Sequence, residues 1–412
     1  MASKLSRRRF VYVSGIAMAA TAATACGGGT TPAEPTAAPA EPTAAPAATT
    51  APAAPAATTA PDAPAAPESK YSEAPELAAK VTSGELPPVD ERLPLEPLVL
   101  NPVHEVGQYG GVWRQLHMGT TDLAQNSYKT YEFLGKFNPD GVIEPNVAKG
   151  WEFSEDGTSI TIYLREGMKW SDGAPFTTAD VAFWWNDIVL NDELTPAKPA
   201  ALKRAGELGV LEIVDDYTFS ITWGEPYGAF YDRLSTTRMW QPAHYLKTYH
   251  VDYADEAELE ALMNEAGFDL WTDLFSAQTA FSNNPGTPDL MPWNVTNSVD
   301  SPVQVWTRNP YYHKVDTAGN QLPYIDRLER TLLTDAEAIL LKAIAGDADF
   351  ESRRLENVQN YPVVKENEEK GGYRLILEDN AGSNIGTTFW NYAHKDEYLR
   401  ELFLNKDFRI GM

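Results

Sequence analysis

The sequence predicts an α/β protein whose folded body follows a long disordered tether. Strand-like and helix-like patterns alternate along residues 109–412, which is typical of a mixed α/β body. The 412 residues are 43% hydrophobic and 11% aromatic, which is enough to build large cores. Ahead of this body, residues 30–67 consist almost entirely of Ala, Pro and Thr, and such a segment cannot bury enough apolar surface to fold.

The clearest local pattern lies in residues 151–185 and predicts a turn, a strand, a second turn and a helix. Polar and apolar side chains alternate over residues 159–164, which is the period of a half-buried strand. One Asp-Gly dipeptide precedes this strand and another follows it, and both are typical of turns. Thr177 is placed to cap a helix over residues 178–190, because Asp180 lies three positions further on.

Further strands and helices follow in order along the chain. Period-two alternation predicts the strands, and apolar stripes with capping residues predict the helices. The expected strands are one entered through a turn at 109–113, a hairpin of 211–214 with 217–223, then 303–308 and 373–378. The expected helices are 200–208, 255–266 ended by Gly267, one capped by Thr334 and ended by Gly346, and one opening at Asp407.

Residues 1–25 have the features of an export signal that is removed from the mature chain. The run SRRRF at residues 6–10 resembles the twin-arginine export consensus. The small-residue stretch over 11–25 is only weakly apolar and too short to span a bilayer. An ordinary Sec signal is the alternative, because Val11 and Tyr12 depart from the Leu-Lys that usually follows the twin arginines.

Cys26 is the only cysteine in the chain and directly follows the predicted signal. The sequence Ala-Thr-Ala-Cys resembles a lipobox, in which cleavage before the cysteine leaves its thiol to carry a diacylglyceryl group. Two or three acyl chains make such an anchor stable. We therefore predict lipidation at Cys26 and a disordered linker over residues 26–75, with a secreted or uncleaved form as the alternative. A single cysteine permits no intramolecular disulfide.

Short motifs follow one another from Ala148 to Val181: Trp-Glu, Asp-Gly, an alternating strand ending in Leu-Arg, Trp-Ser-Asp-Gly, and Thr-Ala-Asp-Val. This run resembles the signature of the extracytoplasmic solute-binding proteins of ABC importers, family 5, the oligopeptide, dipeptide and nickel type. Arg-Asn-Pro-Tyr-Tyr at 308–312 also resembles a family segment. The resemblance implies a two-lobed periplasmic-binding-protein-like fold of type II, with two α/β lobes joined by crossing strands.

Four polar or aromatic residues of the signature could be mistaken for a site. They are Arg165, Trp170, Asp172 and Asp180. Turn caps and a buried tryptophan account for them without a ligand, so we expect them to support the fold rather than to hold the solute.

The resemblance also sets the expected domain organisation. The solute-binding body is expected over residues 76–412, with a first lobe over about 101–290 and the start of a second lobe over about 291–412. Residues 402–412 resemble a family segment that normally opens a helix and continues for a long stretch. The chain is therefore interpreted as C-terminally truncated, with an incomplete second lobe that exposes apolar surface.

Composition and motifs argue against several classes of function. A formal net charge of -25 argues against nucleic acid as a partner. The chain contains no Gly-x-Ser-x-Gly, P-loop or His-Glu-x-x-His motif, so we expect no enzyme, no catalytic residue and no cofactor. Its six histidines are scattered, so no metal site is expected, although some family members bind nickel or haem.

The resemblance implies a monomeric, lipid-anchored receptor at the outer face of the cytoplasmic membrane, in the cell envelope or periplasm. Such a receptor captures an oligopeptide or an oligosaccharide by closing its two lobes and delivers it to the permease subunits of an ABC transporter. Eleven Trp and nineteen Tyr supply rings that suit stacking on sugars or contact with peptide side chains, although core formation also accounts for many of them. The expected ligand-binding residues are Trp293, Trp240, Trp390, Asn391, Tyr109 and Trp113.

Two other functions stay open. An extracytoplasmic hydrolase, such as a glycosidase, needs two carboxylates about 5–10 Å apart across a cleft, and no spacing in this sequence selects such a pair. A chemosensory or adhesive surface protein could share the binding fold.

Overall fold

The computed structural model describes residues 69–119, 122, 131–355, 357–377 and 389–412. The predicted export signal, Cys26 and most of the predicted linker lie outside these residues. The folded body makes its first contacts slightly ahead of the boundary expected at residue 76, because Ser72 forms a β-bridge with Asn320 and Ala74 is buried. Within the described residues, no helix is both long and apolar enough to cross a bilayer.

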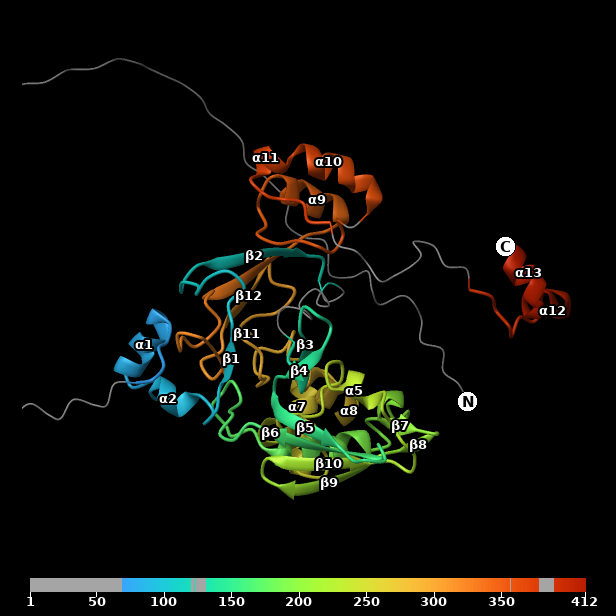
Figure 1. The fold of residues 1–412 in the computed structure, drawn as a ribbon, viewed down its shortest axis with the longest axis horizontal. Coiled ribbons are helices and arrows are strands. Elements are labelled where there is room, and N and C mark those ends of the chain that lie inside the picture. Colours follow the sequence, from blue (N-terminus) through green and yellow to red (C-terminus); the bar gives the residue numbers. More distant parts are fainter. Residues whose placement is uncertain (1–68, 120–121, 123–130, 356, 378–388) are drawn as a thin grey trace, which may run out of the picture. The chain divides into compact units, whose positions relative to one another are not determined.

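One four-stranded antiparallel sheet is built around the signature segment. Its order is β5 (Ala148–Phe153), β6 (Ser159–Leu164), β10 (Thr218–Thr222) and β9 (Val210–Asp215) (Figure 1). The alternation predicted for β6 is confirmed, since every second side chain of this strand is buried. The predicted hairpin is also confirmed, because β9 and β10 are adjacent antiparallel strands.

The buried face of this sheet belongs to a large apolar cluster, here called the first core. Its members from the sheet include Ile160, Ile162, Phe219 and Ile221, and its members from other segments include Trp170, Phe176, Trp185, Phe230, Trp240 and Leu290. Each fully buried side chain of this size stabilises the fold by about 1.5–3 kcal/mol. The signature segment therefore lies at the centre of the best-packed part of the chain.

The helix predicted over residues 178–190 is present but changes its winding. α4 (Thr178–Phe183) begins with the predicted capping box at Thr177 and continues as the π-helix η2 (Trp184–Val189). The three consecutive aromatic residues Phe183–Trp185 are all buried. The change of winding falls within this aromatic run, since Phe183 ends the α-helix and Trp184 begins the π-helix.

A second four-stranded sheet brings distant parts of the chain side by side. Its order is β11 (Trp293–Val295), β12 (Val303–Arg308), β14 (Arg327–Leu332) and β2 (Val112–His117), and the β14–β2 pair is parallel (Figure 1). The predicted strand over 303–308 and the strand entered at 109–113 are both confirmed. This sheet contributes to the second core, which consists of Met291, Trp293, Val295, Trp306 and Leu328 with Trp113, Tyr131, Phe281 and Ile325 against them.

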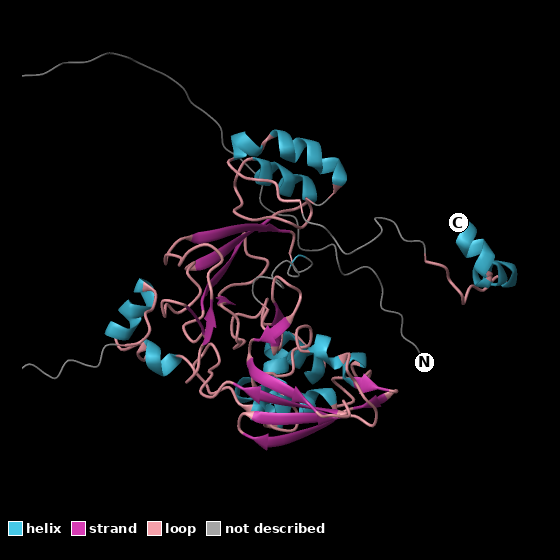
Figure 2. Cartoon of the chain, viewed as in Figure 1, coloured by secondary structure: helices cyan, strands magenta, loops and turns pink. Residues whose placement is uncertain are grey.

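Short strands and helices make up the rest of the described regular structure (Figure 2). The short strands pair as β1 (Leu98–Leu100) with β13 (Lys314–Asp316), β3 (Gly135–Phe137) with β4 (Ile143–Pro145), and β7 (Lys203–Arg204) with β8 (Glu207–Leu208). The other helices are α1 (Pro75–Thr82), α2 (Val89–Arg92), α5 (Phe230–Arg233), α6 (Ala243–Leu246), α7 (Glu256–Ala266), α8 (Trp271–Gln278), α9 (Ala336–Ile344), α10 (Tyr361–Glu366), α11 (Glu368–Gly371), α12 (Glu397–Leu404) and α13 (Lys406–Gly411), and the 3-10 turns are Ala200–Leu202, Lys247–Tyr249 and Val358–Asn360.

Two expected elements are wrong. In place of the helix expected over 200–208, a 3-10 turn leads into the β7–β8 hairpin, because the backbone at Ala205 and Gly206 has positive φ and reverses the chain. In place of the strand expected over 373–378, residues 373–377 are irregular, and residue 378 lies outside the described residues. The Tyr373 hydroxyl donates to the carbonyl of Val364 in α10 (2.5 Å), and no described strand pairs with this segment.

Helix ends were predicted to within a residue or two. α7 is confirmed, with the Asp255 side chain at its start. α9 is capped by Asp335 instead of Thr334, and α13 by Asn405 instead of Asp407. In both corrections the capping oxygen belongs to an Asp or Asn that accepts a backbone N–H three residues further on.

Candidate functional site

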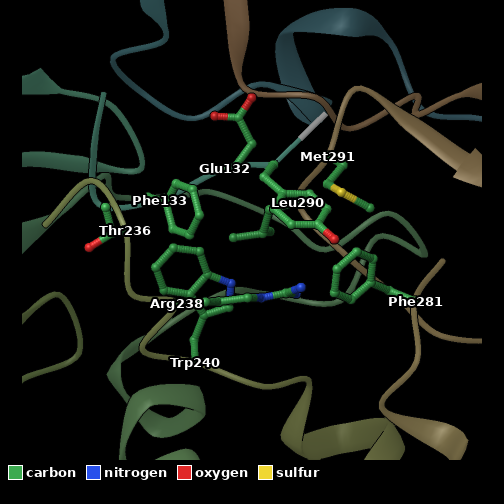
Figure 3. Close-up of a pocket in the computed structure, with 9 residues that line it drawn as sticks. Glu132, Phe133, Thr236, Arg238, Trp240, Phe281, Leu290 and Met291 are labelled. Atoms are coloured by element: carbon green, nitrogen blue, oxygen red, sulfur yellow. The ribbon is translucent and has the colours of Figure 1, made fainter. Parts of the chain in front are cut away.

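A cavity of about 320 Å³ lies where the two cores meet (Figure 3). Its walls come from loop residues in three regions of the sequence, at 131–133, 236–240 and 281–291, which are adjacent in space. The lining residues are Tyr131, Glu132, Phe133, Thr236, Arg238, Trp240, Phe281, Leu290 and Met291. Trp240 and Leu290 belong to the first core, whereas Met291, Tyr131 and Phe281 belong to the second. A concave apolar site at the junction of two cores is a typical place for a small-molecule ligand.

Aromatic rings form most of the cavity wall. Trp240 is 1% exposed and its ring packs edge-on against Phe176 of the first core, with ring centres 5.7 Å apart. On the second-core side, the rings of Tyr131 and Phe281 meet edge to face at 5.5 Å. These contacts leave little freedom to the rings, so the cavity wall is preformed.

Arg238 places a cation among these rings. Its guanidinium carbon lies 4.9 Å from the ring centre of Phe281 and 5.9 Å from that of Trp240. Figure 3 shows the Arg238 and Trp240 side chains lying next to one another at the cavity. Both distances allow a cation–π attraction, which holds the guanidinium in place without using its N–H donors.

Two nitrogen donors at the cavity lack acceptors within the described chain. Arg238 Nε and Trp240 Nε1 are both enclosed, and neither forms a hydrogen bond with any described residue. An enclosed donor without an acceptor costs about 1–3 kcal/mol. Groups of this kind are expected where solvent or a ligand supplies the missing acceptors.

A buried carboxyl group lies within electrostatic range of Arg238. Asp289 is 1% exposed, and burial raises the pKa of its carboxyl to about 7, against the opposing effects of Arg238 and of a hydrogen bond from the Met291 N–H. In turn, burial lowers the pKa of Arg238, and Asp289 opposes this shift. The charges of the two groups therefore act on one another directly beside the cavity.

The polar groups of the signature segment hold two of the three cavity regions. The Ser171 N–H donates to the Asp289 carbonyl (3.0 Å), and the Asp289 N–H donates back to the Ser171 hydroxyl (3.1 Å). The Asp180 carboxylate accepts from the Ala243 N–H (3.1 Å) and from the Trp170 indole N–H (3.2 Å). The signature thus fixes the loop that carries Asp289 and the loop that ends at Ala243.

The other two signature residues also contact the chain itself. Arg165 donates to the carbonyls of Asn146 (2.8 Å) and Glu96 (3.1 Å), and Asp172 pairs with His244 (2.7 Å). The expectation that the signature residues support the fold agrees with these contacts.

A buried ion pair holds the segment that carries Tyr131 and Phe133. The Glu132 carboxylate accepts from Lys314 Nζ at 2.8 and 3.0 Å and from the Tyr312 hydroxyl at 2.6 Å. Both charged side chains are almost fully buried, at 3% and 1% exposed. Burial is the largest single influence on Glu132 and disfavours its charge, but Lys314 together with the other nearby basic groups keeps the pKa of Glu132 below its usual range.

A second cavity, of about 270 Å³, lies beside the second core. It is lined by Pro292, Trp293, Tyr312, Leu322, Pro323, Tyr324 and Ile325. Here the polar atoms of the aromatic residues have partners. The Trp293 indole N–H donates to the Ile325 carbonyl (3.0 Å), and the Tyr324 hydroxyl donates to Asp316 (2.6 Å).

The structure distributes the six predicted ligand-binding residues among three places. Trp240 lines the first cavity and Trp293 the second. Trp113 packs edge-on against Trp293 at 6.0 Å. The Tyr109 hydroxyl donates to the Gln321 carbonyl (2.8 Å), and its ring packs near Tyr324 at 5.9 Å. Trp113 and Tyr109 line neither of these two cavities.

The remaining two predicted residues lie close to α12 and α13. The Trp390 ring packs against Phe403 and Phe408, with ring centres 5.2 Å away in both cases. Asn391 shapes a turn, since its side-chain oxygen accepts the Ala393 N–H (3.0 Å). Neither residue is among those that line the two cavities.

Sequence reasoning missed Arg238, Tyr131, Phe281 and Asp289. A signal for Arg238 was present, because it lies two positions before Trp240 and alternate residues of an extended segment point to the same side. No local signal existed for the others, since only the tertiary fold brings residues 131, 281 and 289 to residue 238. The described residues also contain no group of three or more His, Cys, Asp or Glu placed to hold a metal ion.

Comparison with known proteins places this geometry in context. The family described as bacterial extracellular solute-binding proteins, family 5 Middle, matches residues 142–412. The periplasmic alpha-galactoside-binding protein of Rhizobium meliloti is 33% identical over 80% of this chain and 49% of its own length. The chain spans about half the length of the curated relatives it matches.

Solved structures agree with this result. An oligopeptide-binding protein, OppA, is 38% identical, with a TM-score of 0.71 over 82% of this chain and 54% of its own. The periplasmic binding protein MelB of Agrobacterium fabrum, in complex with stachyose, is 29% identical, with a TM-score of 0.59 over 72% of this chain and 45% of its own. The predicted periplasmic-binding-protein-like α/β fold is confirmed by these similarities.

Proposed function

Because the chain belongs to family 5 of the bacterial extracellular solute-binding proteins, we propose that it is a receptor that captures a small solute outside the cytoplasm. The observation that carries this proposal is the aromatic cavity at the junction of the two cores, with two enclosed donors that have no acceptor within the described chain. We further propose that the captured solute is delivered to the permease subunits of an ABC importer, as the family's role implies.

An oligosaccharide is the solute class that the first cavity suits best. Flat aromatic rings pack against the apolar faces of sugar rings, and N–H donors at the cavity edge bind hydroxyl oxygens. The names of two relatives point the same way, since one binds an alpha-galactoside and another was solved with stachyose. An oligopeptide is the second candidate, because the similar structure of higher identity is an oligopeptide-binding protein.

Capture by closure follows from the composition of the cavity wall. A solute in the cavity would touch Trp240 of the first core and Phe281 of the second at the same time. It would therefore stabilise the arrangement in which the two cores lie close together and shift the population toward it. The free energy of this shift is the difference between the solute's binding free energies in the two arrangements.

We propose no catalytic role for the carboxyl groups near the cavity. A glycosidase needs two carboxylates that face the scissile bond. Both oxygens of Glu132 already accept hydrogen bonds from Lys314, and Asp289 is buried and does not line the cavity. A hydrolase would need a pair of carboxylates that is free to reach the substrate.

We also propose that the receptor is a monomer tethered to the outer face of the cytoplasmic membrane through lipid on Cys26, after export through the twin-arginine signal. These features come from residues outside the described part of the chain. Replacing Cys26 with Ser should move the protein from the membrane fraction to the soluble extracytoplasmic fraction. Replacing Arg7 and Arg8 with Lys should block export, whereas an unchanged distribution would favour a Sec signal.

Calorimetric titration of the purified protein tests the receptor proposal. Raffinose and stachyose represent the alpha-galactosides, and a tripeptide and a tetrapeptide represent the alternative. We expect saturable binding of at least one of the sugars, a rise in the thermal midpoint and a change in tryptophan fluorescence, because Trp240 lines the cavity. Binding of the peptides alone would select the second candidate. Binding of neither class would contradict the receptor proposal.

A further inference from the structure

The contacts of Arg238, which is partly exposed, differ from those of the arginines that are almost fully buried. Four arginines that are at most 6% exposed each donate to two or more acceptors of the chain itself: Arg92, Arg165, Arg308 and Arg330. Arg238 is held by two aromatic rings and by the charge of Asp289, and no described residue accepts a hydrogen bond from its side chain. A guanidinium carries five N–H donors in a planar fork, and the enclosed Nε donor of Arg238 has no acceptor within the described chain.

The indole of Trp240 adds a further donor at the same wall. Its N–H also lacks an acceptor in the described chain, and its ring forms part of the apolar surface. The cavity thus offers flat apolar rings together with donors that need oxygen acceptors. A sugar ring has matching features, because its C–H groups form an apolar face and its hydroxyl oxygens lie around the rim.

The charges near the cavity distinguish a neutral sugar from an anion. The positive charge of Arg238 is opposed by Asp289, and the negative charge of Glu132 is opposed by Lys314. Above pH 7, where the Asp289 carboxyl is ionised, both pairs are balanced, and the cavity has no excess positive charge that would favour a carboxylate over a neutral ligand. What Arg238 retains is its directional fork of donors, which fits two adjacent oxygen atoms.

We propose that Arg238 is the specificity-determining residue of a sugar subsite, where its guanidinium donates to two neighbouring hydroxyl oxygens of one ring while Trp240 and Phe281 contact the ring's apolar faces. The inference rests on the proposed receptor function and names the part of the solute that this cavity takes. A volume of about 320 Å³ is at the small end of the range for small-molecule sites, so the cavity accepts part of an oligosaccharide. The rest of the solute extends beyond it.

Three variants of the full chain test the proposal. R238Q removes the charge and the fork, R238K keeps the charge and removes the fork, and R204Q is the matched control. Arg204 also lies 5.9 Å from an aromatic ring, that of Tyr227, but it is exposed and does not line the cavity. Raffinose and stachyose are titrated by calorimetry into the wild type and each variant. We expect R238Q and R238K to weaken binding by about 10- to 100-fold, as for the loss of hydrogen bonds from a charged group, and R204Q to bind like the wild type.

Ring specificity provides a second, independent measurement. Methyl α-galactoside and its monodeoxy analogues, each lacking one ring hydroxyl, are compared in competition with raffinose. The wild type should lose affinity for the analogues that lack either of two neighbouring hydroxyls, and R238Q should bind these analogues and the parent equally. A merely structural role of Arg238 would lower the thermal midpoint and leave the order of the analogues unchanged.

The outcomes separate this inference from the receptor proposal. If the wild type binds raffinose or stachyose and R238Q binds as tightly, the receptor proposal stands and the role of Arg238 is wrong. If R238K retains wild-type affinity, or if galacturonate competes better than galactose, the site recognises an anion and the neutral-sugar assignment is wrong. If the wild type binds peptides and no sugar, the sugar class is wrong and the subsite is rejected with it.

Discussion

The two cavities are similar in size and in aromatic lining but differ in the partners of their polar atoms. In the second cavity, the Trp293 indole N–H and the Tyr324 hydroxyl both donate to acceptors of the chain. In the first cavity, Arg238 Nε and the Trp240 indole N–H have no acceptor among the described residues. A hydrogen-bonded tryptophan is accounted for by the fold, whereas an enclosed donor without an acceptor needs a further explanation. On this difference we base the proposal that the first cavity binds the solute and the second stabilises the fold.

A buried network connects the two cavities, so they are not independent. Glu132 lines the first cavity and Tyr312 lines the second, and the Tyr312 hydroxyl donates to the Glu132 carboxylate. Lys314 supplies the opposite charge. Breaking this network should therefore affect the whole region, whereas changes at single rings should separate the cavities.

The largest expected effect is that of K314M, which tests the connection between the cavities. The variant leaves the Glu132 carboxylate buried without its counter-charge, and we expect a loss of about 3–5 kcal/mol in the free energy of unfolding, measured by urea denaturation. K149M is the matched control, because Lys149 pairs with Glu96 at 2.9 Å on the surface and should contribute at most about 1 kcal/mol. Equal effects of the two variants would show that the buried pair does not hold the region together.

The comparison itself is tested by the same substitution in each cavity. W293F leaves the Ile325 carbonyl without its donor, so it should reduce the free energy of unfolding by about 1–3 kcal/mol and leave solute affinity unchanged. W240F removes no hydrogen bond of the described chain, so it should destabilise less and weaken solute binding by about 2- to 10-fold. Calorimetry and thermal denaturation give both readouts. The opposite pattern would exchange the roles of the two cavities.

Secondary structure was predicted correctly from the sequence where one segment contains its own hydrophobic pattern, with or without capping residues. Strand β6 and helix α7 each carry their own signal, in alternation for the first and in an apolar stripe with Asp255 and Gly267 for the second. The prediction failed at 373–377, where β-like composition has no described strand to pair with. Local composition cannot supply a neighbour, and a strand needs one.

The candidate site was harder to predict than the secondary structure, because local sequence does not show which distant residues become neighbours. Trp240 could be proposed from the aromatic excess, but Phe281 and Asp289 come close to Arg238 only through tertiary contacts, since both lie more than 40 residues from it in the sequence. The hydrogen bonds of the signature segment agree with its interpretation as scaffold, and the structure adds what it supports. Ser171 and Asp180 fix the loops that carry Asp289 and Trp240. The most recognisable residues of the chain therefore position the less recognisable ones.

A pH series tests whether Asp289 is neutral beside the first cavity. Burial raises its pKa in the folded state to about 7, above its value of about 4 in the unfolded chain. The resulting stability is fully present below pH 4 and is lost as pH rises through 7. Between pH 5 and pH 8, the free energy of unfolding of the wild type should decline as Asp289 ionises. D289N resembles the neutral acid and cannot ionise, so we expect its free energy of unfolding to decline by about 1–2 kcal/mol less over the same range. Other titrating groups are common to both proteins and cancel in the difference, so parallel curves would show that Asp289 is ionised throughout.

The smallest expected effect is that of H244Q, at the Asp172–His244 pair outside both cavities. It gives the change in stability against which the effects at the two cavities are compared. The hydrogen bond to Asp172 raises the pKa of His244, but the two side chains are 35% and 42% exposed. Because solvent screens such a pair, H244Q should lower the free energy of unfolding by no more than about 1 kcal/mol. The raised pKa means that this contribution is present below about pH 6.5 and is lost at higher pH. The thermal midpoint of H244Q should therefore lie below that of the wild type at pH 5.5 and equal it at pH 8. Solute affinity should be unchanged at both pH values. A loss of affinity in H244Q would show that the Asp172–His244 pair contributes to solute binding, which would weaken the distinction between scaffold and cavity.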